Sequence, residues 1–155
     1  MDRKWIAVVR VRGSTGMPKE LDATFKSIAL TRVNHCVIVD NSPQNMGAII
    51  RVKDYITWGE INGETAKALI SKRGMLEGRK KLTDAHAKAS GFANIDDYVK
   101  KLMAFGAGMN SIKGMKRVFR LHPPRKGYVS IKKRYPYGAL GNRGAEMGEL
   151  LKRMM

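Results

Sequence analysis

The sequence predicts a small two-layer domain in which three strands alternate with two helices, followed by a helical region and an irregular basic extension. Short apolar runs alternate with apolar residues at helical spacing over about the first sixty positions. Further helical patterns follow, and the last forty or so residues are rich in Gly, Pro and basic residues. A chain of 155 residues can bury a core without disulfides. We therefore expect a β-α-β-α-β core at 1–61, an added helical region at 62–112 and a basic extension at 113–155.

The first strand is predicted at 5–9, an apolar run typical of a buried strand that continues into an alternating stretch bearing Arg10 and Arg12. A turn at 13–16 separates it from a helix whose first position suits Pro18. The core face of that helix is predicted from the spacing of Leu21, Phe25 and Ile28.

A second buried strand is predicted at 36–39 and ends in the turn-forming stretch 40–43. Ser42 is expected to cap a helix that begins at Pro43. The inward face of this helix should carry Met46, Ile49 and Ile50. A third strand is expected at about 54–61, which completes the two-layer core.

The helical region is predicted to contain a helix capped by Asn62 that ends before Gly74. A second helical pattern covers 83–105 with an interruption near Gly91, after which Asn94 is a suitable cap. Asp96 and Asp97 lie in the first turn of that last helix, where the dipole favours acidic residues, so they suit helix stabilisation better than catalysis.

The extension is expected to contain one short strand at 118–121 and an irregular stretch at 122–142. A short amphipathic helix at the C-terminus is indicated by Met147, Leu150, Leu151 and Met154.

The charge of the chain points to a polyanionic partner. Lys and Arg total 30 against 13 Asp and Glu, which gives a formal charge of +17 and a pI near 10.3. The excess is uneven, because residues 98–145 hold 12 basic residues and no Asp or Glu. Uniform basicity would be explained by solubility, whereas this asymmetry favours a contact surface for nucleic acid. No apolar run approaches the roughly 20 residues that cross a bilayer, so a membrane partner is not expected.

The strongest candidate for RNA contact is the segment 113–143, in which cations are interleaved with aromatic residues. Cations bind phosphates, while aromatic and guanidinium planes stack on unpaired bases. A flexible basic tail whose aromatic residues pack on the domain is the plainer alternative. The predicted RNA-binding residues of this segment are Lys113, Lys116, Arg117, Arg120, His122, Arg125, Lys126, Tyr128, Lys132, Lys133, Arg134, Tyr135, Tyr137 and Arg143.

The turn at 13–16 is a second candidate, since a glycine-containing turn before a helix exposes backbone N–H groups that suit a phosphate. An ordinary strand-to-helix connection explains it equally well. The other residues predicted to bind RNA are Arg10, Arg12, Arg32, Arg51, Lys53, Arg79, Lys80 and Lys81.

The sequence offers no catalytic constellation. His35, His86 and His122 are scattered and have no Cys or acidic neighbour at the spacing of metal ligands. Cys36 lies inside an apolar run, where an inert core thiol is expected. No complete phosphate-binding glycine motif is present. We therefore expect no enzymatic activity, no cofactor, no metal and no small-molecule substrate.

The single cysteine excludes an internal disulfide and favours a reducing compartment. The first five residues lack the apolar stretch of a secretory signal. A cytoplasmic location is the expectation.

The assembled motifs resemble one known family, large-subunit ribosomal protein thirty of the universal scheme, in its longer archaeal and eukaryotic form. The most specific stretches are Trp58-Gly59-Glu60-Ile61 and Leu121-His122-Pro123-Pro124-Arg125-Lys126-Gly127. All the matching stretches lie at 9–13, 33–40, 52–61, 80–84, 119–127 and 135–144. The short bacterial form corresponds only to about the first sixty residues.

The resemblance implies an α+β fold whose core is a three-stranded antiparallel sheet with two helices on one face and the first strand in the middle. Helical connections alone would instead suggest parallel pairing, and here we follow the family.

The resemblance also implies a structural constituent of the large ribosomal subunit that binds its RNA and neighbouring ribosomal proteins during translation. The small RNA of that subunit is an open further partner. An extraribosomal RNA-processing or regulatory factor is the alternative. Cutting the chain before Lys113 is expected to leave the domain folded and to weaken incorporation into subunits.

Overall fold

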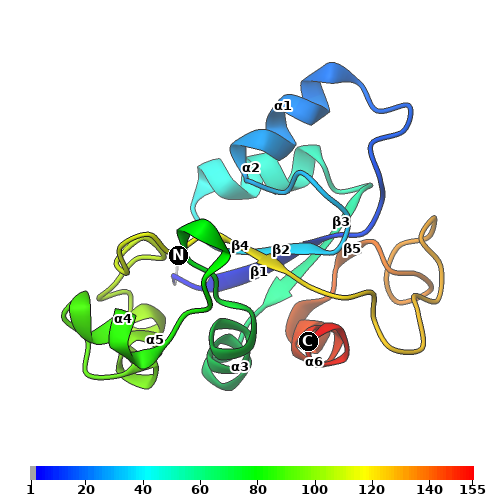
Figure 1. The fold of residues 1–155 in the computed structure, drawn as a ribbon. Coiled ribbons are helices and arrows are strands. Elements are labelled where there is room, and N and C mark those ends of the chain that lie inside the picture. Colours follow the sequence, from blue (N-terminus) through cyan, green and yellow to red (C-terminus); the bar gives the residue numbers. More distant parts are fainter. Residues whose placement is uncertain (1–2) are drawn as a thin grey trace.

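The computed structural model describes residues 3–155. They form one mixed sheet with helices on both faces (Figure 1). The sheet has five strands in the order β4-β2-β1-β3-β5. Their bounds are β1 Trp5–Arg10, β2 His35–Asp40, β3 Ile56–Glu60, β4 Val118–Arg120 and β5 Gly141–Asn142. The α+β class, the antiparallel three-stranded core and the central position of β1 are confirmed, and the short strand expected at 118–121 is β4. The complete sheet has five strands, two more than the core alone. The extension supplies both edge strands, β4 and β5.

The pairing of the first three strands follows the family resemblance. β1 is antiparallel to both neighbours, and Ala7 faces Ile38 on one side and Gly59 on the other. β2 and β3 therefore run in the same direction, as a helical connection favours, but β1 lies between them. The helical connections alone suggested that β2 and β3 would pair with each other in parallel. They do not, because β1 is inserted between them and pairs with both. At the edges, β4 is antiparallel to β2, and the two-residue β5 is parallel to β3.

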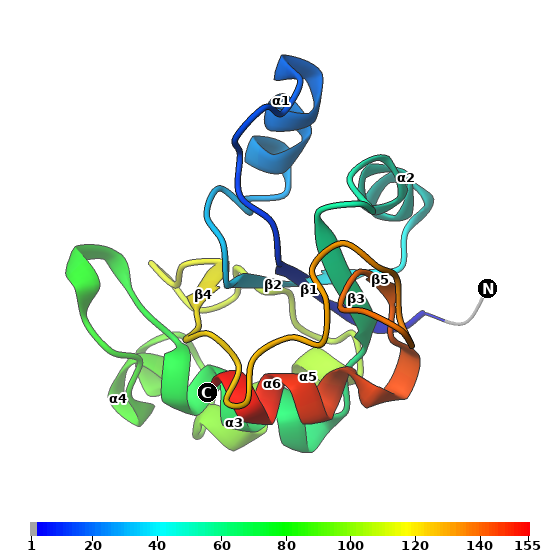
Figure 2. The same ribbon diagram turned by 90° about the vertical axis from the view of Figure 1, so that its right-hand side faces the viewer.

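One face of the sheet is covered by α1, Lys19–Ser27, and α2, Pro43–Arg51 (Figures 1 and 2). Its core contains Val8 and Val37 from the sheet and Phe25 and Ile49 from the helices. The oxygen of Ser42 accepts a hydrogen bond from the Asn45 N–H, so the predicted cap of α2 is confirmed. Two helices on this face agree with the expectation, with each helix starting within a residue of its predicted position.

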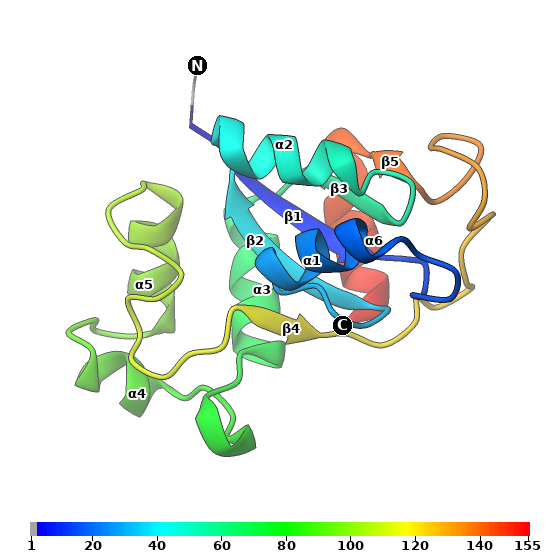
Figure 3. The same ribbon diagram turned by 90° about the horizontal axis from the view of Figure 1, so that it is seen from above.

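The opposite face is also covered, by helices of the later chain (Figure 2). The helices against the sheet are α3 Gly63–Arg73 and α6 Met147–Met154. Beyond the sheet, α5 Ile95–Met103 packs beside α3, and α4 Asp84–Ala89 packs on α5 (Figure 3). The short 3-10 turns are η1 Glu77–Arg79 and η2 Gly144–Glu146. The interruption near Gly91 separates α4 from α5, as predicted. Asn62 and Asn94 precede their helices without a side-chain cap. For α5, the carboxylate of Asp84 accepts a hydrogen bond from the Ile95 N–H instead.

The core of this second face draws on the whole length of the chain. Cys36 and Ile38 of β2 pack in one cluster with Leu69 of α3, Phe119 of β4 and Leu151 of α6. Phe119 and Leu151 are fully buried. This packing argues against a folded domain that ends before Lys113, because such a cut removes β4 and α6 from the core. The division at residues 61 and 112 stays a prediction.

Gly59 lies where β3 passes under η2, and this close approach yields a prediction. A Cβ at Gly59 would stand 2.3 Å from the Gly144 carbonyl oxygen. Gly59→Ala is expected to lower the free energy of unfolding by about 2 kcal/mol, because one backbone segment must move away. Gly47→Ala is the matched control: an added Cβ meets no atom within 4 Å, and alanine favours the helix by about 0.5–1 kcal/mol. Denaturant unfolding of both variants checks the prediction, which a stable Gly59→Ala contradicts.

Candidate nucleic-acid interface

The topology brings basic residues from distant parts of the sequence to one end of the sheet. β1 ends beside the starts of β2 and β3, and β4 ends beside the start of β2, because each of these pairs is antiparallel. We call this the basic end. It is formed by Arg12, Arg32, Lys53, Arg120 and the part of the extension at 121–143. The extension and the connection between β1 and α1 lie together at this end (Figure 3). The opposite end of β2 and β3 carries Asp40 and Glu60 instead.

The extension is irregular but anchored by hydrogen bonds. The Leu121 N–H donates to the Asn34 carbonyl at 3.2 Å, and the His122 N–H donates to the Met154 carbonyl at 3.0 Å. The guanidinium of Arg153 donates to the carbonyls of Arg125 and Gly127, at 2.7 Å in each case. The extension is therefore fixed to the C-terminal helix rather than free, and Arg153 is an anchor that the sequence did not indicate.

The tip of the extension exposes apolar and basic side chains together. Val129 is 87% exposed, Tyr137 79% and Ile131 47%. The cations Lys132 and Lys133 on the same loop are exposed as well. Exposed large apolar residues without a partner mark contact surfaces, and cations beside them favour an anionic partner. Val129 and Ile131 were not predicted as site residues, because an isolated aliphatic residue in a loop carries no recognisable signal.

Two predicted arginines meet around one acidic residue at the basic end. The guanidinium of Arg134 lies 3.2 Å from the Asp54 carboxylate, and that of Arg12 donates to the Asp54 carbonyl at 3.3 Å. Arg12 also stacks over the ring of Tyr55 at 5.2 Å. Asp54 thus holds both arginines in place while their outer surfaces stay accessible.

Arg143 and Tyr135 form a second ordered pair. The Arg143 guanidinium stacks over the Tyr135 ring at 4.8 Å and donates to Thr57 Oγ1 at 3.4 Å. Burial lowers the pKa of Arg143. The Tyr135 hydroxyl bonds to the carboxylate of Glu146, which raises the pKa of that tyrosine. Tyr137 is left exposed, and of these three residues it is the one best placed to stack on a base.

Tyr128 is directed toward the protein rather than outward. Its hydroxyl donates to Asn34 Oδ1 at 3.2 Å, its ring packs on the core, and burial raises its pKa to about 12. For this residue the plainer alternative from the sequence, packing on the domain, describes the geometry better than stacking on RNA.

Arg10 requires a correction. Its side chain is fully buried, and its guanidinium donates to the carbonyls of Leu30 at 2.8 Å and Thr31 at 3.0 Å and to Ser14 Oγ at 2.8 Å. It also lies 4.1 Å from the centre of the Phe25 ring. Such a side chain does not reach a phosphate, so Arg10 stabilises the loop after β1 instead of contacting RNA. The sequence pattern misled because the alternation at 10–12 suggested two outward arginines.

A second group of cations lies along the edge formed by β4. Arg120 is opposite His35 across the β2–β4 pair. Arg79, Lys116 and Arg117 line a pocket with Arg120. The connector that carries Arg79 reaches this edge through a backbone bond from the Lys116 N–H to the Met75 carbonyl at 2.8 Å. The structure thus joins residues of the connector and the extension that are separated by about forty positions.

The remaining predicted residues do not form one cluster. Arg51 ends α2 and borders a hollow between α1 and α2 together with Glu20. Lys113 is exposed near α4, where its N–H donates to Ser90 Oγ at 3.3 Å. The other exposed predicted residues are Lys80, Lys81, His122, Arg125 and Lys126. RNA contact stays a prediction for all of these residues.

The described residues give no sign of a catalytic site. Cys36 is buried, and burial raises the pKa of its thiol. No group of three or more His, Cys, Asp or Glu residues within 3–155 could hold a metal ion. Over the same residues, none of the helices combines the length and apolar character needed to span a bilayer.

Comparison with known proteins identifies the family. The family model described as ribosomal protein L30p/L7e matches residues 6–56, which cover β1 to the start of β3. The chain is 41% identical over 149 residues to large ribosomal subunit protein uL30 of Archaeoglobus fulgidus, covering 96% of this chain and 98% of that protein. It is 45% identical over 154 residues to uL30 of Methanococcus maripaludis strain C5, again with 96% and 98% covered. The uL30 of Methanopyrus kandleri is 38% identical over 149 residues, covering 94% of this chain and all of that protein. The chain belongs to the uL30 family of large ribosomal subunit proteins.

Proposed function

We propose that the chain is a structural, non-enzymatic constituent of the large ribosomal subunit that binds large-subunit rRNA through its basic end. The observation that carries this proposal is the similarity to uL30 proteins over nearly the full length, extension included. The charge pattern supports it, because the acid-free stretch 98–145 contributes most of the basic end.

The proposed mechanism is placement of cations by a rigid scaffold. Phosphate contacts by Arg and Lys fix the register and orientation of a protein on folded RNA. Arg120 is held at the end of β4 by its pairing with His35. Arg12 and Arg32 lie just outside β1 and β2, where the Arg12 N–H donates to the Tyr55 carbonyl at 3.1 Å and the Arg32 carbonyl accepts from the His35 N–H at 3.3 Å. Selectivity comes from RNA shape and from unpaired bases, since side chains do not enter the deep major groove of A-form RNA.

Sedimentation tests the proposal directly. The protein is expected to remain with large subunits through a high-salt gradient, at about one copy per subunit. Crosslinks from the extension should map to rRNA nucleotides of the large subunit. A protein that sediments away from subunits would be an extraribosomal RNA-binding factor, and the proposal would be wrong.

Neutralising the tip of the extension should weaken RNA binding in a salt-dependent way. Each phosphate contact contributes about 0.7–0.9 to the slope of log affinity against log salt concentration, so losing two contacts reduces the slope by about 1.5. Lys132→Gln with Lys133→Gln is the variant, and Lys88→Gln with Lys100→Gln is the control with equal loss of charge on exposed residues. Filter binding to large-subunit rRNA over a salt series gives the slopes. Equal slopes for the two variants would remove the tip from the interface.

A further inference from the structure

We propose that a pocket beside β4 receives one unpaired nucleotide of the rRNA, with its base inside and the adjoining phosphates on the basic rim. The inference rests on the proposed function, because it names the element of RNA structure that this surface recognises. The sequence did not suggest a pocket, since its lining comes from three separate parts of the chain, at 29–35, 75–79 and 116–120.

The register of β2 and β4 builds one wall of the pocket. Arg120 is opposite His35 and Val118 is opposite Val37, and paired residues of adjacent strands share a face of the sheet. Cys36 and its partner Phe119 point to the other face, where both are buried in the core. His35, Val118 and Arg120 therefore all project on the side of α1 and α2.

The pocket has an apolar floor and the size of a ligand site. Its volume is about 390 Å³, and Val118, Met75 and Ala29 are among its lining residues. Pockets that bind small ligands have about 300–1,000 Å³ and are lined mainly by apolar groups with a few polar ones. An unstacked base presents two flat apolar faces and a polar edge, so its shape and chemistry suit such a floor.

The rim of the pocket is positively charged and therefore favours an anionic ligand. Arg79, Lys116, Arg117 and Arg120 all line it, and no Asp or Glu is among its lining residues. All four cations are exposed. In the described residues none of the four takes part in an ion pair with a carboxylate. Four cations without a carboxylate partner around an apolar floor suit a nucleotide, in which phosphates flank a base.

His35 supplies an aromatic surface within this pocket. Its Nδ1 is buried and has no hydrogen-bond partner in the described chain. Burial, together with the nearby charges of Arg120, Arg32 and Arg10, lowers the pKa of His35. The lowered pKa favours the neutral ring, which adds a flat face next to the base.

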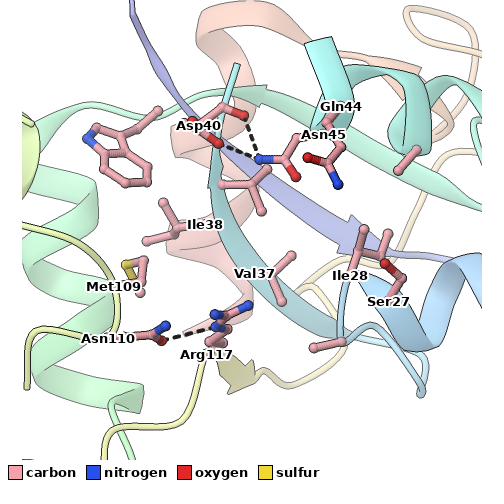
Figure 4. A pocket seen from close by; sticks show the side chains of 14 residues that line it. Ser27, Ile28, Val37, Ile38, Asp40, Gln44, Asn45, Met109, Asn110 and Arg117 are labelled. Atoms are coloured by element: carbon pink, nitrogen blue, oxygen red, sulfur yellow. Dashed lines mark hydrogen bonds between the residues drawn. The ribbon is translucent and has the colours of Figure 1, made fainter. Parts of the chain in front are cut away.

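A neighbouring hollow explains why the nucleotide is assigned to the β4 pocket. This hollow of about 250 Å³ lies between α2 and the loop before β4, and it also contains Ala29 and Arg117 (Figure 4). There Arg117 donates to Asn110 Oδ1 at 3.0 Å, and Asp40 is hydrogen-bonded to Asn45. The carboxylate of Asp40 repels a phosphate, and the β4 pocket lacks such a group.

The test fills the pocket without changing its charge. Large subunits are isolated from cells in which the chain carries Val118→Trp, and the rRNA is probed with a reagent that acylates mobile nucleotides. One unpaired nucleotide, protected in wild-type subunits, is expected to become about tenfold more reactive, in line with the loss of one base-stacking contact. Ile50→Trp is the control, because Ile50 is 53% exposed on α2 and an added indole there leaves the pocket unchanged.

A second variant tests the pocket independently, in case Val118→Trp destabilises the protein and lowers its melting temperature. Arg79→Gln with Arg117→Gln changes only exposed side chains and should release the same nucleotide. Unchanged reactivity throughout the rRNA in both variants, with the protein still present at one copy per subunit, overturns the pocket assignment alone. Crosslinks from Lys116 to an acidic segment of a neighbouring protein also overturn it. Absence of the wild-type protein from washed subunits refutes the proposed function instead.

Discussion

A chain that ends after Ile112 should fail to fold cooperatively, even though it retains β1, β2, β3 and the helices from α1 to α5. The cut removes Phe119 and the buried face of α6, which is formed by Met147, Leu150, Leu151 and Met154. Removing a single large buried side chain costs about 2–5 kcal/mol, so the loss of five costs about 10–25 kcal/mol, which equals or exceeds the stability of a typical domain, about 5–15 kcal/mol. The expected product shows no sigmoidal unfolding transition in urea and binds a hydrophobic dye.

The matched control separates folding from RNA contact. The full-length chain with Lys132→Gln and Lys133→Gln loses exposed cations of the extension but no core residue. It should unfold at the urea concentration of the wild type while binding rRNA more weakly. A truncated chain with a cooperative transition would show that the first 112 residues form an independent domain, as the boundaries predicted from the sequence imply.

The sequence predicted the elements better than their assembly. β1, β2, α2 and α3 lie close to their predicted positions because apolar periodicity and capping residues such as Ser42 act locally. The pairing of β4 with β2 is not local, since it joins Phe119 to Cys36 across about eighty residues. The sequence predicted a short strand at 118–121, but local periodicity does not indicate which other strand it pairs with.

The same limit applies to the candidate site. Composition indicated which segment is basic. Antiparallel pairing brings Arg120 and the loops that carry Arg12 and Arg32 to one end of the sheet. Whether an individual residue can contact RNA depends on its burial, however, and burial cannot be inferred from the residue type. Tyr128 and Tyr137 looked alike in the sequence, yet the first packs on the core and the second is 79% exposed.

Replacing Arg10 should destabilise the fold strongly and leave RNA binding intact. Arg10→Met retains the approximate length of the side chain but removes the donors to the carbonyls of Leu30 and Thr31 and to Ser14 Oγ. It also removes the cation above the Phe25 ring, at 4.1 Å. Hydrogen bonds from charged groups contribute about 1.5–3 kcal/mol, and buried carbonyls left without a donor cost about 1–3 kcal/mol each. We therefore expect a loss of about 4 kcal/mol in the free energy of unfolding.

Two further variants separate the geometry of the guanidinium from its charge. Arg10→Lys keeps the charge but supplies one compact ammonium instead of a planar fork, so it should recover less than half of the loss. Arg12→Met, two positions away, removes a partly exposed side chain and should change stability by no more than about 0.5 kcal/mol. Urea unfolding measures all three, and rRNA affinity is measured at a temperature at which every variant is folded. Because Arg10 has no exposed surface, its loss should leave the salt slope of binding unchanged, whereas a shallower slope for Arg10→Met would restore it to the RNA interface.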